Sequence, residues 1–327
     1  MIRLDSHSLR KGVNKALFYV KNFTAYAVPR SVFRTYLERW KNTLSADELA
    51  VVESRARYYV RLPQGARVSG KSIKLGDYKY PFGQKHKMTA YFFDLYAMVR
   101  FFNPEYEMSY TFGDVNREEE SPTITKSRPV TAGSTMNAIA KLNKERHFKF
   151  VHDSMAYADK KNMLVMRNFV MGQPHRTRFL EMYHDHTLCD AGQTNPCDEH
   201  PEYRKDFMPI AQQLEYKFVC CLEGNDVATN LKWVMSSNSI AVMPKPRMET
   251  WFMEGRLEGG VHYIEIRDDY TDLEEKLRYY MQHHDEAQKI IDNAHRWVEQ
   301  FKNRKMEFLT RLRAMEEYLR QTGQIDA

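Results

Sequence analysis

The stretch that decides the fold is YKFVCCLEGNDVATNLKWVMSSNSIAVM, residues 216–243. Its first apolar run, residues 216–222, predicts a strand that ends at a Glu-Gly pair. Apolar side chains at helical spacing follow over residues 227–235, and residues 239–243 predict a second strand. Strand, helix and strand in this order indicate a parallel sheet covered by helices.

The turn between the first strand and the helix is a candidate binding site. Gly224 lets a ligand approach the backbone, and the free N–H groups of a helix start favour phosphate. Asn225 or Asp226 is expected to cap the helix, and Lys232 adds positive charge in its second turn. Because neither a GxGxxG nor a GxxxxGK[ST] pattern is present, a tight turn without a ligand is an equally good interpretation of the spacing.

The same alternation continues on both sides of this unit. Strands are predicted at residues 106–112, 148–151, 163–167 and 262–266, and a helix at residues 248–253. Residues 9–60, 91–102 and 272–321 have helical patterns, and Ser45 with Glu48 forms a capping box. The chain is therefore expected to have an α/β fold that binds ligands at the carboxyl ends of its parallel strands.

The charge of the chain is uneven. Residues 1–100 hold 19 Lys and Arg against 7 Asp and Glu, so this third carries +12 and the remaining 227 residues carry −6. Such a basic stretch indicates an anionic partner, which can be nucleic acid, a membrane surface or a phosphorylated or acidic substrate. A nucleic-acid-binding protein stays open as an alternative because aromatic residues are interleaved with these cations, although no nucleic-acid motif is present. These aromatic residues are Tyr19, Tyr26, Tyr58, Tyr59, Tyr78 and Tyr80.

Composition excludes several classes of protein. With 327 residues, 43% of them hydrophobic and 28% charged, the chain is neither collagen-like nor wholly disordered. It has no apolar run of about 18 residues, and its start, MIRLDSHSLRKG, lacks the apolar core of a signal peptide. Four cysteines do not make a disulfide framework. We expect a cytoplasmic protein, with peripheral contact to the inner membrane as an option.

Residues 216–243, together with METWFMEGRLEGGVHYIEI at residues 248–266, closely resemble the core of family 90 glycosyltransferases. This family contains protein O-glucosyltransferases, fungal capsule xylosyltransferases and bacterial lipopolysaccharide-modifying enzymes. The segments PEYEMSYTFGD, TKSRPV, KKNMLVMRN and HRTRF occur in the family's order, so the resemblance extends over about residues 104–272. It implies an inverting transfer from a nucleotide sugar, expected to be a UDP-hexose, by two Rossmann-like domains of the GT-B type. It also implies no cofactor and no metal, and the sequence has no Asp-x-Asp motif.

The resemblance also divides the chain. Residues 1–145 would form a basic domain on the acceptor side, residues 146–270 a Rossmann-like domain for the nucleotide sugar, and residues 271–327 helices that pack back on the domains. The missing signal peptide favours the bacterial branch, with a lipopolysaccharide core or another surface glycan as the acceptor. An acidic glycolipid at the inner membrane face would suit the basic third of the chain, where Arg55, Arg57 and Arg61 are candidate contacts.

The resemblance assigns roles to individual residues. Asp114, directly after a predicted strand, falls on the family's general base, which takes the proton of the acceptor hydroxyl. A turn-forming Asp after Gly113 is the alternative, and Glu118, Glu119 or Glu120 is a minor candidate for the base. The departing diphosphate would be held by Arg167, by Arg176 or Arg178, of which the spacing favours Arg176, and by Lys232 and the helix start after Gly224. Further donor-side candidates are Ala228, Thr229, Asn230 and His262, and a buried structural role is an equally good interpretation of His262. Candidate substrate contacts are Ser127, Arg128 and Glu254.

Two features keep other interpretations open. Asn168 and Asn230 stand where relatives have a glycine and an arginine, so a degenerate member that binds sugar nucleotide without transferring it is a third candidate function. Residues 183–200 contain residue types that bind zinc, but without the tight pairs of standard zinc modules. These residues are His184, His186, Cys189, Cys197 and His200.

Overall fold

A computed structural model describes residues 6–34, 43–82 and 88–326. Its central element is a wholly parallel sheet of five strands in the order β11-β9-β8-β6-β7. The strands are β6 (Lys161–Asn168), β7 (Cys189–Gln193), β8 (Tyr216–Cys220), β9 (Ile240–Met243) and β11 (Ile264–Glu265). The α/β class and the strands predicted at residues 163–167, 216–222 and 239–243 are confirmed.

The central strands are apolar along their whole length because helices cover both faces of the sheet. Leu164 and Phe218 point into a core formed with α6 (Pro174–Tyr183), α9 (Leu273–Gln282) and the first part of α10 (His284–Glu299). Val165 and Val219 point the other way, into a core that includes α8 (Leu231–Val234) and continues into the N-terminal helices. The sheet is thus buried on both sides.

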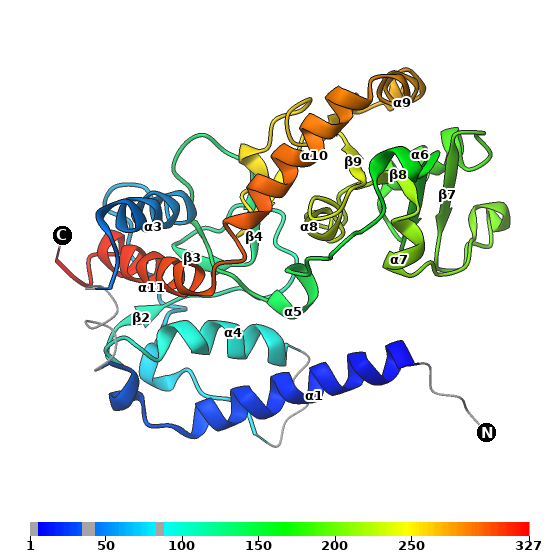
Figure 1. Cartoon of the computed structure of the whole chain (residues 1–327). Helices are drawn as coiled ribbons and strands as arrows, with labels where there is room; N and C mark the ends of the chain where they lie inside the picture. The colour runs from blue at the N-terminus through cyan, green and yellow to red at the C-terminus, as the bar shows by residue number, and fades with distance from the viewer. Residues whose placement is uncertain (1–5, 35–42, 83–87, 327) are drawn as a thin grey trace, which may run out of the picture.

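The N-terminal third of the chain is helical. It contains α1 (Ser6–Ala27), α3 (Ala46–Tyr59) and α4 (Thr89–Val99), and the predicted capping box of Ser45 and Glu48 begins α3. The last helix, α11 (Arg304–Gln321), packs beside α3 and α4, although the two termini of the chain lie on opposite sides of the molecule (Figure 1). Two helices, α5 (Lys144–His147) and α7 (Ile210–Gln213), have only four residues each.

Three two-stranded sheets lie outside the main sheet. They pair β1 (Ile73–Lys74) with β2 (Glu107–Met108), β3 (Thr123–Thr125) with β5 (Asn137–Ile139), and β4 (Ser127–Pro129) with β10 (Met248–Thr250). In the last pair, Thr250 lies opposite Ser127 in an antiparallel ladder. Since β10 follows β9 closely in the chain, this ladder attaches the N-terminal part to the carboxyl edge of the main sheet.

Several predicted elements are wrong or shorter. Residues 248–253 are not a helix, because Met248 to Thr250 form β10. Its partner strand lies far away in sequence, and local spacing does not reveal it, since the paired Arg128 and Glu249 are 121 residues apart. Residues 148–151 form no strand, since Phe148, Phe150 and Val151 pack against the core without a ladder. The elements predicted at residues 106–112, 227–235 and 262–266 are shorter in the structure, where they correspond to β2, α8 and β11. The helical pattern over residues 272–321 corresponds to three helices, α9, α10 and α11.

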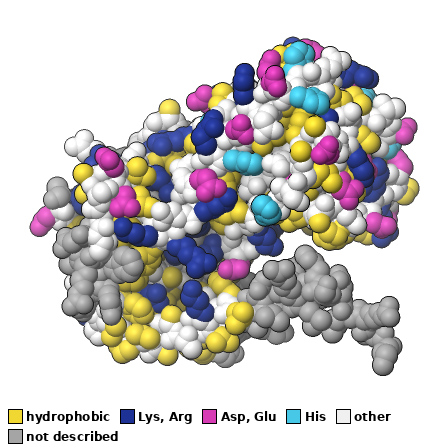
Figure 2. Space-filling model, viewed as in Figure 1, with side chains coloured by type: hydrophobic (Ala, Val, Ile, Leu, Met, Phe, Trp, Pro, Cys, Tyr) yellow, Lys and Arg dark blue, Asp and Glu magenta, His cyan; other side chains and the backbone are white. Residues whose placement is uncertain are grey.

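The basic N-terminal third does not present its aromatic rings as a stacking surface. Tyr59 and Tyr78 are buried, and Tyr19, Tyr26, Tyr58 and Tyr80 are partly buried against the same core. Several Lys and Arg side chains lie close together near the middle of the face in Figure 2. Arg55, however, is buried beside Glu307, so it is not available as the acceptor contact that the sequence predicts.

Within the described residues, we find no helix that combines the length and the apolar character needed to cross a bilayer.

Candidate functional site

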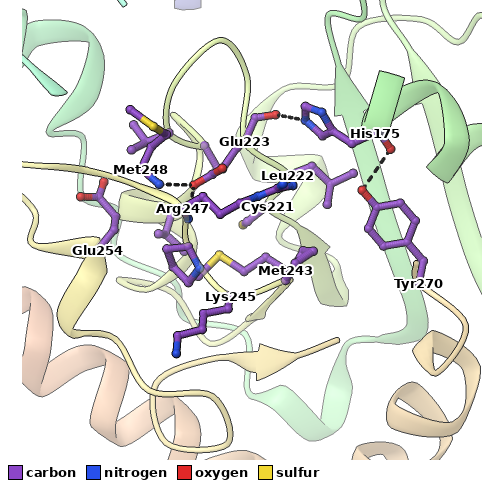
Figure 3. A pocket seen from close by; sticks show the side chains of 15 residues that line it. His175, Cys221, Leu222, Glu223, Met243, Lys245, Arg247, Met248, Glu254 and Tyr270 are labelled. Atoms are coloured by element: carbon purple, nitrogen blue, oxygen red, sulfur yellow. Dashed lines mark hydrogen bonds between the residues drawn. The ribbon is translucent and has the colours of Figure 1, made fainter. Parts of the chain in front are cut away.

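A cavity with about 420 Å³ of empty space, part of it open to solvent, lies at the carboxyl ends of β8 and β9. Its wall combines the residues after β8, the start of α8, and residues 243–248, which connect β9 to β10 (Figure 3). Ligands of open parallel sheets bind at this edge. Apolar side chains of Val227, Ala228, Leu231 and Met243 line the cavity together with the polar groups of His175, Glu223, Lys245, Arg247, Glu254 and Tyr270.

Glu223 connects the two sides of this cavity. Its Oε1 accepts hydrogen bonds from the backbone N–H groups of Arg247 and Met248, each at 2.9 Å. Its carbonyl oxygen accepts one from Nε2 of His175 at 2.8 Å (Figure 3). Burial raises the pKa of the Glu223 carboxyl although the two N–H groups lower it. The side chain therefore fixes the connection between β9 and β10 beside the turn after β8.

Arg176 of α6 also holds the turn after β8 in place. Its Nη2 donates to the carbonyl of Leu222 and its Nε to that of Glu223, both at 2.8 Å. A Cβ atom at Gly224 would lie 3.3 Å from Nη2, so glycine provides room for the guanidinium rather than only for a ligand. Arg176 and Gly224 thus lie together, as predicted, and at least part of the arginine's hydrogen-bonding capacity holds the turn in place.

The helix after this turn begins later in the chain than the sequence predicts. α8 begins at Leu231 and has four residues, so Asn225 and Asp226 do not cap it. Asn230 is the N-cap residue, and its side chain donates instead to the carbonyl of Cys220 at 2.9 Å. Ala228 lines the cavity and Thr229 follows it in this irregular stretch. A phosphate cradle made by a regular helix terminus is therefore not built here.

Asp114, the predicted base, contacts the turn after β8 through a lysine. Lys126 donates a hydrogen bond to the Asp114 carboxylate and forms an ion pair with Asp226 at 2.7 Å. Ser127 holds the neighbouring residue Val115 by accepting its N–H and donating to its carbonyl. Ser127 is fully buried, so it supports the residue next to Asp114 and is not exposed as a substrate contact.

Lys232 and Arg128 are buried away from the cavity opening. The ammonium of Lys232 pairs with Glu254 at 2.5 Å, and both side chains are at most 2% exposed. Glu254 itself lines the cavity. Arg128 bonds Glu249 through Nε at 2.8 Å and donates its other N–H groups to backbone carbonyls, including that of Tyr59. These two cations hold buried parts of the structure together.

Two other predicted donor contacts lie elsewhere. Arg167 forms an ion pair with Asp190 at 2.8 Å and lines a second, more open hollow with Arg204 and Lys205. His262 precedes β11, packs against Trp297 and accepts a hydrogen bond from the backbone N–H of Glu258. Neither side chain lines the cavity at β8 and β9.

Sequence reasoning missed much of the cavity wall. Lys245 and Arg247 alternate with two prolines directly after the strand β9, a pattern that marks a basic loop at the carboxyl edge. His175 and Tyr270 reach the cavity from distant segments, and the Tyr270 hydroxyl donates to the carbonyl of His175 (Figure 3). Their place depends on the tertiary fold, which leaves no local signal.

The segment considered for zinc is dispersed. His184 bonds the Leu180 carbonyl, His186 lies against Glu274, and His200 lies against Glu202. Cys189 belongs to the buried strand β7. Across the described ranges, no three His, Cys, Asp or Glu side chains are placed to hold a metal ion together.

His147 of α5 is buried near Lys126 and Lys232, and it predicts how the stability of the protein depends on pH. Burial, with Lys126 and Lys232 nearby, lowers its pKa to about 2. The unfolded chain therefore binds a proton that the folded chain rejects, and stability should fall as pH drops below about 6.5. We expect the wild type to lose about 2 kcal/mol more than His147→Leu between pH 6.5 and 5, measured by urea unfolding. His152→Leu, at an exposed position, is the control, and an equal loss in all three proteins would contradict this role.

Comparisons with known proteins agree with the geometry. Residues 137–318 match the model of glycosyl transferase family 90. The chain is also 38% identical, over 309 residues, to the O-glucosyltransferase LpsA of Dichelobacter nodosus, an alignment that covers 93% of this chain and 95% of that protein. The predicted resemblance is thereby confirmed and extends over most of the chain.

Proposed function

Because the chain belongs to glycosyltransferase family 90 and is a glycosyltransferase, we propose that it moves a hexose from a nucleotide sugar to a surface glycan with inversion. The observation that carries this proposal is the cavity at the carboxyl edge of the parallel sheet, which is linked to Asp114 through Lys126 and Asp226. The similar protein is named an O-glucosyltransferase, which supports UDP-glucose as the first donor to test.

In the proposed reaction, Asp114 accepts the proton of the acceptor hydroxyl while that oxygen attacks the anomeric carbon. The bond from this carbon to the diphosphate oxygen breaks in the same step, and its electron pair leaves with the nucleoside diphosphate. Attack from the face opposite the leaving group inverts the anomeric centre. Two bonds break, the acceptor O–H bond and the bond from the anomeric carbon to the diphosphate oxygen. Two bonds form, the glycosidic bond and the bond of the transferred proton to Asp114.

The leaving diphosphate needs positive charge. Lys245 and Arg247 line the cavity beside His175, and their donors suit phosphate oxygens. We propose that they act with Arg176 and take the place that the family pattern gives to Arg167, whose side chain pairs with Asp190 outside this cavity. No metal ion or other cofactor takes part in the proposed reaction, following the resemblance.

The acceptor side is proposed to be the N-terminal part. In this arrangement of the GT-B type, residues 1–145 bind the acceptor and residues 146–270 bind the donor. The net charge of +12 on residues 1–100 would suit a phosphorylated or acidic glycolipid, such as a lipopolysaccharide core at the inner membrane face. A cytoplasmic enzyme with peripheral membrane contact fits this proposal.

The test begins with the donor. Purified protein is screened with UDP-glucose, UDP-galactose and UDP-xylose by thermal shift, and release of UDP is then measured with and without deacylated lipopolysaccharide core. Acceptor-dependent release of UDP supports the proposal. Donor binding without release from any acceptor would instead support the degenerate alternative. Salt-sensitive binding of oligonucleotides, with no response to nucleotide sugars, would support the nucleic-acid alternative.

A second measurement decides which hollow holds the donor. Arg247→Met should raise the dissociation constant for UDP-glucose by roughly 10-fold or more, because a charge-assisted hydrogen bond contributes about 1.5–3 kcal/mol. Arg204→Met, in the hollow that contains Arg167, should change it less than about twofold. Isothermal titration calorimetry checks both. The opposite ranking would place the donor in the Arg167 hollow.

A further inference from the structure

Lys126 is a buried lysine that contacts carboxylates from two distant parts of the chain. Its side chain is 2% exposed, and it joins Asp114, which precedes β3, to Asp226 in the turn after β8. Asp226 directly precedes Val227, which lines the cavity. The lysine therefore ties the predicted base to the cavity wall.

From this geometry we propose that Lys126 is a positioning residue, which holds the Asp114 carboxylate in place and supplies the positive charge that lies next to it. The inference rests on the proposed function, since it takes Asp114 as the base. It adds a role for a residue outside the predicted site.

The two carboxylates differ in a way that separates their roles. The Asp226 side chain is 5% exposed, whereas that of Asp114 is 32% exposed, so an acceptor hydroxyl can reach only the latter of this pair. The pair with Asp226 at 2.7 Å anchors the ammonium to the turn, and the hydrogen bond to Asp114 then fixes the exposed carboxylate.

Lys126 itself remains protonated. Burial opposes its charge, but Asp226, Tyr91 and Asp114 outweigh that effect and raise its pKa. Tyr91 and His147, which also face it, keep their protonation state between about pH 5 and 8. Burial raises the pKa of Tyr91 of α4 and lowers that of His147 of α5 to about 2, while Lys232 of α8 is paired with Glu254.

The experiment compares three variants at saturating UDP-glucose, with deacylated lipopolysaccharide core as acceptor. Lys126→Met should lower kcat by about 10-fold or more at pH 7, leave the KM for UDP-glucose within about threefold, and move the acid limb of the kcat–pH profile up by about one pH unit or more. Lys126→Arg should restore most of the rate and the profile. Lys160→Met removes another buried lysine, paired with Asp153 at 2.8 Å, and should leave the profile unchanged.

Asp226→Asn is the second route if Lys126→Met does not fold. In this variant the ammonium of Lys126 keeps Asp114 as its only carboxylate partner of the two. The acid limb of the kcat–pH profile should therefore stay or move to lower pH, and a shift to higher pH would overturn the proposal. A profile for Lys126→Met that matches Lys160→Met would overturn it as well. If Asp114→Asn is inactive in that case, only the role of Lys126 fails. Full activity of Asp114→Asn would show that the proposed base is wrong.

Discussion

Replacing Asp114 with asparagine should reduce glycosyl transfer by about 10²- to 10⁴-fold, the usual contribution of a general base. The amide keeps the shape of the side chain but does not accept the proton of the acceptor hydroxyl. Binding of UDP-glucose should stay almost unchanged, because the donor cavity is formed by other residues. Initial rates of UDP release and calorimetric titration with UDP-glucose measure the two effects separately.

Glu120→Gln is the matched control for this experiment. Glu120 is an exposed carboxylate six residues away in the same loop region, so its loss should leave transfer within about twofold of wild type. If Asp114→Asn stayed active while Glu120→Gln, or the same change at Glu118 or Glu119, lost activity, the base would be one of these glutamates.

The largest effect on stability is expected at Glu307, which binds three partners inside the protein. Its Oε1 accepts from Arg55 of α3, and its Oε2 accepts from Lys141 and, at 3.0 Å, from Nε1 of Trp251. Glu307→Gln leaves two buried cations without their counter-charge, which should lower the free energy of unfolding by about 3–5 kcal/mol. Guanidinium chloride unfolding at pH 7 measures the loss.

Glu299→Gln provides the comparison. Glu299 pairs with Lys302 at 2.6 Å on the surface of the protein, where solvent screens the interaction, so its removal should have no measurable effect. An unfolding midpoint for Glu307→Gln equal to that of Glu299→Gln would mean that other groups compensate the charges of Arg55 and Lys141.

The parts of the fold that sequence reasoning found are those with a local signal. Strands β6, β8 and β9 are recognisable because they are buried on both faces and hence apolar throughout. The strand β10 was not predicted, because its formation depends on pairing with β4. Its buried Glu249 also looks like a surface residue until Arg128 is seen beside it.

The candidate site was predictable to a similar degree. Gly224 and Ala228 lie in the stretch between β8 and α8, so the strand itself indicates their place at the carboxyl edge. The direction of a long side chain carries no such signal. Lys232 turns inward to Glu254, and Arg167 turns to Asp190, because each is drawn to a carboxylate from another segment.

The contact between α3 and α11 also affects how the protein is made. Arg55 and Glu307 are 252 residues apart in sequence, so the N-terminal helices are synthesised long before their partner exists. Contacts of such high sequence separation form slowly, and the uncovered apolar face of α3 is open to aggregation in the meantime. A nascent chain that has not reached α11 should therefore depend on chaperones to keep its first third out of aggregates.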